Sequence, residues 1–224
     1  SSTIRNLPHD AVRDFTPVVM MATTPYLLLV HPSVPANNLR ELVAYAKANP
    51  AKVNVGHAGI GVGNHLTGLL VTQHWGADLT QVPYRGGAQA TTDTIAGTVD
   101  FFVSTWPQVV SLVREGRLRA LGIGAPARLH EAPDVPSFAE LNAPDLAVDA
   151  WFGLWAPART PAEIITRLSD ALLRILAEAA MRERLQGQGF VAAPMASAPF
   201  AEFQKSELAR WKALVDLTGI KLSG

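Results

Sequence analysis

Four glycines fall within ten residues in the stretch Gly56-His57-Ala58-Gly59-Ile60-Gly61-Val62-Gly63-Asn64-His65. Glycine adopts backbone conformations that other residues avoid, so this stretch predicts a tight turn. A short apolar run, Val53–Val55, precedes it, and Asn64–Trp75 follows with the composition of a helix. A strand, a glycine-rich turn and a helix in this order form the repeating unit of α/β proteins.

The same alternation continues in both directions from this stretch and predicts an α/β fold built on largely parallel sheets. Phe15–His31 is expected to form two strand segments interrupted at Thr23-Thr24-Pro25. Further strands are predicted at Leu79–Val82, Val99–Val103, Leu118–Ile123, Trp151–Ala156 and Phe190–Ala193. Helices are predicted from a cap at Asn37 or Asn38 to Asn49, at Ala88–Ala96, Pro107–Arg114, Ser137–Leu141, from Pro161 (capped by Thr160) to Ala177, and at Met181–Gln186 and Pro199–Thr218.

Composition excludes several classes of protein. Of the 224 residues, 48% are hydrophobic and 17% charged, which is typical of a compact globular protein. The formal net charge is zero and no basic cluster occurs, which argues against a nucleic-acid partner. No apolar run is long enough to insert into a membrane. Cysteine is absent, which excludes disulfides and thiolate sites in these residues.

The glycine-rich stretch has two interpretations. Its backbone N–H groups, next to a helix N-terminus, would form an anion site favoured by the helix dipole. Alternatively, the glycines only serve a turn that needs positive φ. A dinucleotide fingerprint would require glycine at position 64, which is Asn64, and the G-K-[ST] of a phosphate-binding loop is missing.

Two further strand ends carry polar side chains. Tyr84 and Arg85 follow the Leu79–Val82 strand, and a guanidinium is the natural bidentate partner of a carboxylate. Ser104 and Thr105 end the Val99–Val103 strand, and ligands in open α/β sheets bind beyond such ends. The alternatives are that Arg85 is an ordinary surface residue and that Thr105 only caps the next helix.

Catalytic and metal-binding patterns are missing from the sequence. The six histidines have no metal-ligand spacing, and no G-x-S-x-G element occurs. We therefore expect neither an enzyme, a metal site nor a cofactor. An α/β enzyme that uses Ser104 or His57 is the weaker alternative.

Several motifs, taken in order, resemble the Bug-type solute-binding proteins of tripartite tricarboxylate transporters. Val82-Pro83-Tyr84-Arg85-Gly86-Gly87, followed by Asp93, Gly97 and Val99-Asp100, is similar to a signature of this family. The glycine-rich turn ending at His65 is similar to another. The remaining matches are Asp14-Phe15-Thr16-Pro17-Val18, Leu118-Arg119-Ala120-Leu121 with Pro133-Asp134-Val135-Pro136, and Trp151-Phe152-Gly153-Leu154 with Ala156-Pro157.

The resemblance implies a two-lobe periplasmic-binding-protein-like fold (type II-like) whose cleft closes on a small carboxylate. The lobes are expected at 1–22 with 148–224 and at 23–147. The family's N-terminal strand and P-F-x-x-G-G loop have no counterpart here, so we expect the N-terminal segment of the first lobe to be missing. The ligand-binding residues are expected to be Ala58, Gly59, Ile60, Gly61, Gly63, Asn64, His65, Tyr84, Arg85, Gly86, Ser104 and Thr105.

The implied function is that of a periplasmic carrier. It would capture a dicarboxylate, a tricarboxylate, an acidic amino acid or an aromatic acid and deliver it to the subunits of a membrane transporter. The alternative within the same resemblance is a ligand sensor that presents its closed form to a signalling protein.

Overall fold

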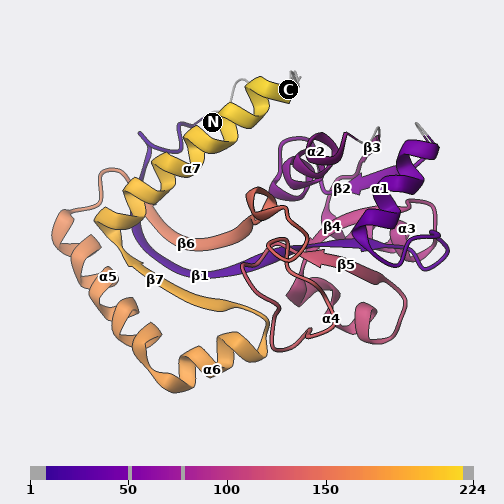
Figure 1. Cartoon of the computed structure of the whole chain (residues 1–224). Helices are drawn as coiled ribbons and strands as arrows, with labels where there is room; N and C mark the ends of the chain where they lie inside the picture. The colour runs from indigo at the N-terminus through magenta and orange to yellow at the C-terminus, as the bar shows by residue number, and fades with distance from the viewer. Residues whose placement is uncertain (1–8, 50–51, 77–78, 219–224) are drawn as a thin grey trace. The chain divides into compact units, whose positions relative to one another are not determined.

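A computed structural model of the chain describes residues 9–49, 52–76 and 79–218. The chain divides into two compact units, the first comprising Ser1–Thr24 with Trp151–Gly224 and the second comprising Pro25–Ala150. The elements, labelled in Figure 1, are β1 (Phe15–Val30), α1 (Leu39–Ala48), β2 (Asn54–His57), α2 (Gly63–Trp75), β3 (Thr80–Pro83), α3 (Gly87–Ile95), β4 (Phe101–Thr105), α4 (Trp106–Arg114), β5 (Arg119–Ile123), the 3-10 turn η1 (Pro144–Leu146), β6 (Asp149–Pro157), α5 (Ala162–Ala177), α6 (Ala179–Gly187), β7 (Val191–Ala196) and α7 (Ser197–Thr218).

The second unit is a sheet in the order β3-β2-β4-β1-β5 with helices on both faces. Strand β2 pairs in parallel with β3 and with β4, each of which is followed by its own helix. Strand β1 pairs antiparallel with β4 and β5, so the expectation of largely parallel pairing is wrong for this strand. Its direction depends on partners far along the chain, which a local pattern does not encode. The predicted α/β class is confirmed.

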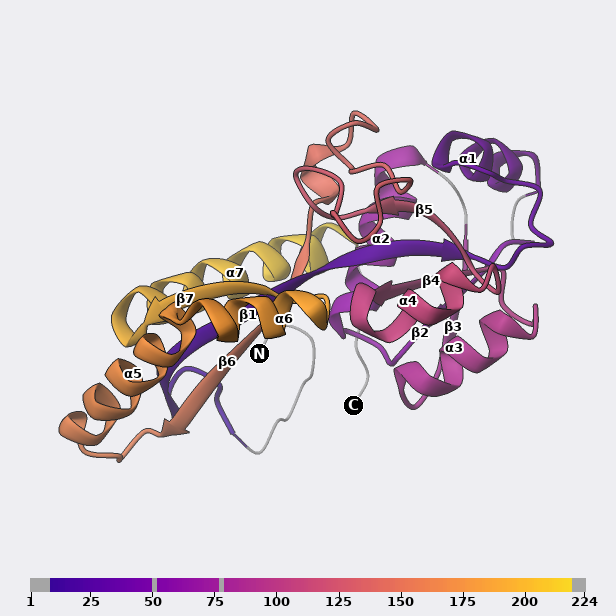
Figure 2. The same ribbon diagram turned by 90° about the horizontal axis from the view of Figure 1, so that it is seen from below.

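Side chains of the buried strands alternate between the two faces of this sheet. Leu28 and Val30 lie in the cluster formed with α1 and α2, whereas Leu27 and Leu29 lie in the cluster formed with α3 and α4. This period of two is the one expected of strands covered on both faces. Figure 2 shows α1 on one side of the sheet and α3 and α4 on the other.

Strand β1 is continuous from Phe15 to Val30, which corrects the predicted interruption at Thr23-Thr24-Pro25. Pro25 has no N–H to donate to a sheet. However, pairing with β7 ends at Thr23 and pairing with β4 begins at Tyr26. Because Pro25 stands between these two pairings, its missing donor costs no hydrogen bond to β7 or to β4.

The first unit is built around the other half of the same strand. There β1 pairs antiparallel with β7 and also pairs with β6. Helices α5 and α6 cover an apolar cluster that includes Val18, Val19 and Ile165. Phe200 of α7 is fully buried, with its ring 5.0 Å from that of Trp155 in β6.

Two predicted details of the helices are wrong. Helix α5 begins at Ala162 with Pro161 in the cap position, and the Thr160 N–H donates to the Pro157 carbonyl, so Thr160 precedes the cap. Ser137–Leu141 forms turns instead of a helix. The Phe138 N–H donates to the Ile123 carbonyl, and this contact extends the end of β5 instead of starting a helix.

Candidate functional site

The carboxyl ends of the three parallel strands meet at one edge of the second unit's sheet. The glycine loop (residues 58–62) connects β2 to α2, the turn at Tyr84-Arg85-Gly86 connects β3 to α3, and Thr105 connects β4 directly to α4. Parallel pairing places all three connections at the same edge. Ligands of open α/β sheets bind at such an edge.

All three helices begin there without a capping side chain. The cap positions are Val62, Gly86 and Thr105, and none of their side chains accepts a hydrogen bond from the first turn. The first N–H groups of a helix have no acceptor within the helix, and the helix dipole adds positive potential around them. Three uncapped N-termini at one edge therefore form a region of backbone donors suited to an anion.

The glycine loop uses backbone conformations that only glycine adopts easily. Gly59 has φ of 133° and Gly61 has φ of 79°. Positive φ was the simpler of the two interpretations of this stretch, and it holds at these two positions. It does not compete with anion binding, because the amides of Gly59, Ile60 and Val62 have no acceptor among the residues that the structure describes.

Two buried histidines flank this loop: His57 precedes it at the end of β2, and His65 follows it in the first turn of α2. His57 is 2% exposed and His65 is 4% exposed, and their ring centroids lie 4.1 Å apart. His57 Nδ1 lies 2.9 Å from the Gly59 carbonyl oxygen, and the Gly61 N–H donates to His65 Nδ1 at 3.0 Å. Burial lowers the pKa of both rings, that of His65 to about 4 with a further contribution from the charge of His57.

The first turn of α2 is held by two close contacts. The Ala58 N–H reaches Asn64 Oδ1 at 3.4 Å, so Asn64 also bonds the loop. Gly63 lies against the phenol of Tyr26, because a Cβ at position 63 would lie 2.2 Å from the Tyr26 oxygen. Burial raises the pKa of that phenol to about 12, so it stays neutral.

The turn after β3 is joined to the glycine loop. The Tyr84 N–H donates to the His57 carbonyl at 2.9 Å. Burial and a hydrogen bond to Asp93 raise the pKa of Tyr84 to about 12. Arg85 is exposed, and no ion pair of its guanidinium occurs within residues 9–49, 52–76 and 79–218. An exposed cation thus lies in the turn that leads into α3.

The end of β4 completes the edge. Ser104 is buried and its hydroxyl donates to Gln108 Oε1 at 2.9 Å. A Cβ on Gly87 would lie 3.9 Å from that same amide oxygen and 3.9 Å from the Ala58 Cβ. Gln108 therefore lies between the end of β4 and Gly87 at the start of α3.

The structure thus gathers the residues singled out in the sequence at one edge, while their ligand roles stay predictions. His57, His65 and Asn64 bond the loop itself, and Ser104 bonds Gln108; among the described residues neither Ser104 nor His57 is hydrogen-bonded in a nucleophile–base pair. Sequence reasoning missed Gln108 and Tyr26. Nothing in their local sequence distinguishes them, because both reach the site only through the sheet order.

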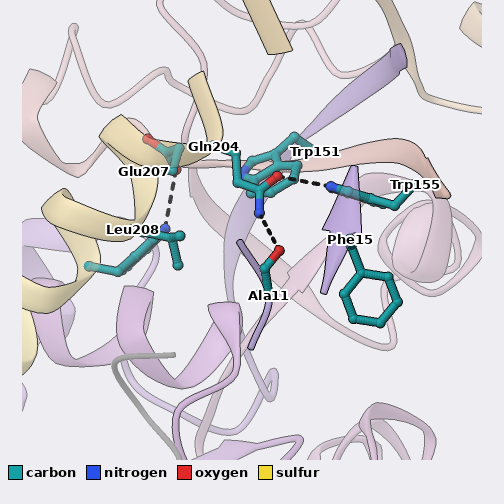
Figure 3. Close-up of a pocket in the computed structure, with 8 residues that line it drawn as sticks. Ala11, Phe15, Trp151, Trp155, Gln204, Glu207 and Leu208 are labelled. Atoms are coloured by element: carbon teal, nitrogen blue, oxygen red, sulfur yellow. Dashed lines mark hydrogen bonds between the residues drawn. The ribbon is translucent and has the colours of Figure 1, made fainter. Parts of the chain in front are cut away.

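An apolar cavity of about 340 Å³ lies within the first unit, and Figure 3 shows its lining. Its polar groups are already engaged: Gln204 accepts from Trp155 Nε1 and donates to the Ala11 carbonyl, and Glu207 accepts from Trp211 Nε1. Because the described lining side chains offer mainly aromatic carbon and their polar atoms are engaged, the wall suits an apolar group better than a carboxylate. Its lining residues are Ala11, Phe15, Trp151, Trp155, Gln204, Glu207, Leu208 and Trp211.

Neither a membrane-spanning helix nor a metal cluster is found in the described part of the chain. No described helix is both long and apolar enough to cross a membrane. No group of three or more His, Cys, Asp or Glu side chains is placed to hold a metal ion among the described residues.

A family model described as the tripartite tricarboxylate transporter family receptor matches residues 2–220. The chain belongs to this receptor family. It is a family of receptors and not of enzymes. The resemblance drawn from the sequence motifs is confirmed.

Protein BugT of Bordetella pertussis is 32% identical to this family member over 99% of the chain and 68% of its own length. For three other curated relatives the chain spans between 54% and 62% of their length.

Two solved structures resemble this receptor over nearly all of its length. Rpa4515 of Rhodopseudomonas palustris, solved with adipate, has a TM-score of 0.91 at 28% identity and covers 97% of this chain and 73% of its own. MatC of Rhodopseudomonas palustris, solved with bound malate, has a TM-score of 0.84 at 33% identity and covers 96% and 74%. Both ligands are dicarboxylic acids.

Proposed function

We propose that this chain is part of a periplasmic solute-binding protein that captures a small carboxylate and delivers it to a tripartite tricarboxylate-type membrane transporter. The observation that carries the proposal is the edge at which three uncapped helix N-termini meet. The family assignment and the dicarboxylates in two similar structures support it. The two compact units would be the two lobes of such a carrier.

The proposed site holds a carboxylate with backbone donors. The amides of Gly59, Ile60 and Val62 and the first turn of α3 would donate to its oxygens, as helix N-termini do to anions. Arg85 would add a charge-assisted hydrogen bond. Ser104, with the Gln108 side chain to which it is hydrogen-bonded, and Thr105 at the end of β4 would line the remaining side of the site.

A thermal-shift screen tests this function directly. The chain is heated with malate, with adipate and with the uncharged diamide of each acid, which keeps the shape of the ligand and removes its charge. A ligand that binds only the folded state adds about 2.7 kcal/mol of stability at a hundredfold excess over its Kd. For a protein of this size that raises Tm by roughly 5–10 °C.

The role of Arg85 is tested with a matched pair of variants. Arg85→Gln should weaken binding of the shifting acid by about tenfold or more, because a charged hydrogen bond contributes about 1.5–3 kcal/mol. Arg114→Gln removes an equally exposed charge at the far end of α4 and should leave binding unchanged. Equal weakening by both variants would mean that general charge, and not Arg85, attracts the ligand. No shift with either acid or with any other carboxylate would contradict the proposed function.

A further inference from the structure

The glycine loop is bonded by a pair of uncharged imidazoles, His57 and His65, whose ring planes are inclined by 37°. His65 is a single turn into α2, and its Nδ1 accepts the Gly61 N–H. An imidazole nitrogen that accepts a hydrogen bond carries no proton. His65 therefore has its proton on Nε2, and the bond to Gly61 exists only while the ring is neutral.

His57 makes the complementary contact at the other end of the loop. Its Nδ1 lies 2.9 Å from the Gly59 carbonyl oxygen, which can only accept a hydrogen bond. His57 Nδ1 must therefore be the donor, so the two rings adopt opposite tautomers. Both rings are almost completely buried, with centroids 4.1 Å apart.

These contacts determine which amides of the glycine loop are left to donate to a ligand. His65 takes the Gly61 N–H and Asn64 takes the Ala58 N–H. The amides of Gly59, Ile60 and Val62 are left without an acceptor among the described residues. With Gly59 and Gly61 both at positive φ, losing either histidine contact would let the peptide units rotate and redirect these donors.

We propose that His57 and His65 are positioning residues that hold the glycine loop in its anion-receiving conformation, and that protonation of His65 releases the loop and weakens carboxylate binding. A protonated Nδ1 would point a second donor at the Gly61 N–H, so the bond cannot survive. This inference rests on the proposed function for its effect on the ligand, but the tautomers themselves do not depend on any ligand.

The groups around the pair leave burial as the main influence on its charge. Burial lowers the pKa of His65 first, and the charge of His57 lowers it further. The phenol of Tyr26, which lies against Gly63 at the start of α2, stays neutral. No carboxylate bonds either ring among the described residues. Release therefore requires acid and is half complete near the pKa of about 4.

Long-range ¹H–¹⁵N spectra of the imidazoles in the unliganded chain test whether His57 and His65 hold the glycine loop through these hydrogen bonds. The expected result is an Nε2–H tautomer for His65 and an Nδ1–H tautomer for His57, the less common form of a free neutral histidine. The Gly61 amide signal should shift with the same midpoint as the His65 ring on acidification. An Nδ1–H tautomer for His65, or a Gly61 amide that ignores its titration, would overturn the proposal.

Calorimetric titration with malate and with adipate tests the effect on the ligand, using two nearly isosteric variants. In His65→Asn the side-chain oxygen takes the place of Nδ1 and can still accept the Gly61 N–H, whereas in His65→Leu nothing can. We expect His65→Asn to bind within about threefold of the wild type and His65→Leu to bind at least tenfold more weakly, about 1.4 kcal/mol. Circular dichroism confirms that both variants are folded.

The pH profile separates a positioning role from a merely structural one. The ligand's own protonation affects the wild type and His65→Asn equally, so the ratio of their Kd values isolates His65. The Kd of the wild type divided by that of His65→Asn should rise as pH falls toward about 4, and it should not change with pH above about 6.5. A flat ratio throughout, or wild-type binding by His65→Leu, would overturn the proposal. If no acid binds even the wild type, the proposed function fails. The imidazole spectra still show whether the two histidines hold the glycine loop.

Discussion

Gly63→Ala gives the sharpest test of how α2 is seated on the sheet. A Cβ at this position would lie 2.2 Å from the Tyr26 oxygen and 3.0 Å from Tyr26 Cζ, far inside ordinary contact. Tyr26 cannot move away freely, because it packs against the core cluster of α1 and α2 and its strand pairs on both sides. The variant must therefore displace either the helix or the ring.

The magnitude follows from two opposing effects. Overpacking of this kind costs about 1–3 kcal/mol. Replacing a helical glycine by alanine recovers up to about 1 kcal/mol through the unfolded chain. We expect Gly63→Ala to lower the free energy of unfolding by about 1–2 kcal/mol, measured by urea denaturation.

A double-mutant cycle with Tyr26→Phe shows whether the clash is the cause. Removing the phenol oxygen eliminates the 2.2 Å approach and leaves Cζ at 3.0 Å as the nearest atom. The double variant should then regain at least about 1 kcal/mol relative to the sum of the two single changes. Gly68→Ala, in the same helix, is the control: its nearest neighbour is Val55 Cγ1 at 3.6 Å, so it should stabilise the chain by about 0.5–1 kcal/mol.

Two results would refute this reasoning. The first is a Gly63→Ala variant as stable as Gly68→Ala. The second is strict additivity with Tyr26→Phe, which would mean that the phenol oxygen is not what Gly63 makes room for.

Two further predictions concern stability. Because the unfolded chain protonates His65 near the ordinary pKa of 6.5 and the folded chain only near about 4, the free energy of unfolding should fall as pH drops through this window, by up to about 3 kcal/mol. Urea denaturation at about pH 7 and about pH 4.5 measures this fall. An equal fall in the free energy of unfolding of His65→Asn between the two pH values would contradict the prediction. Asn38→Ala should destabilise the chain by about 1 kcal/mol in the same assay, because Asn38 Oδ1 accepts the Glu41 N–H at 2.9 Å as the cap of α1. Asn38→Asp keeps the acceptor and should be nearly neutral.

The carboxylate site, if it acts as proposed, depends on backbone geometry more than on particular side chains. Among the described residues of this edge, Arg85 offers a charge without an ion pair, and the other donors named above are amides of the glycine loop and of helix N-termini. Backbone donors recognise a carboxylate group whatever chain it is attached to. Under the proposed function, selection among acids would then depend on contacts other than these backbone donors.

The amino-acid sequence by itself determined the local elements. Glycine after the last turn of a helix predicted the ends of α3 and α4, and Gly97 and Gly116 indeed have φ of 75° and 69°. Asn38 was predicted as one of two candidate caps and makes the cap bond of α1. These features follow from interactions within a few residues, so a local pattern carries them. The family motifs likewise sufficed to identify the receptor family.

Tertiary structure alone decided how these elements meet. A local reading of Thr23-Thr24-Pro25 suggests a break, but β1 continues because Pro25 falls between its two sets of strand partners. The sequence predicts a ligand role for His65, and only the fold shows that this ring is buried against His57 and bonded to Gly61. Gln108 and Tyr26 reach the site through the strand order. Contacts between residues distant in the chain depend on the packing of whole elements, which no local sequence pattern specifies.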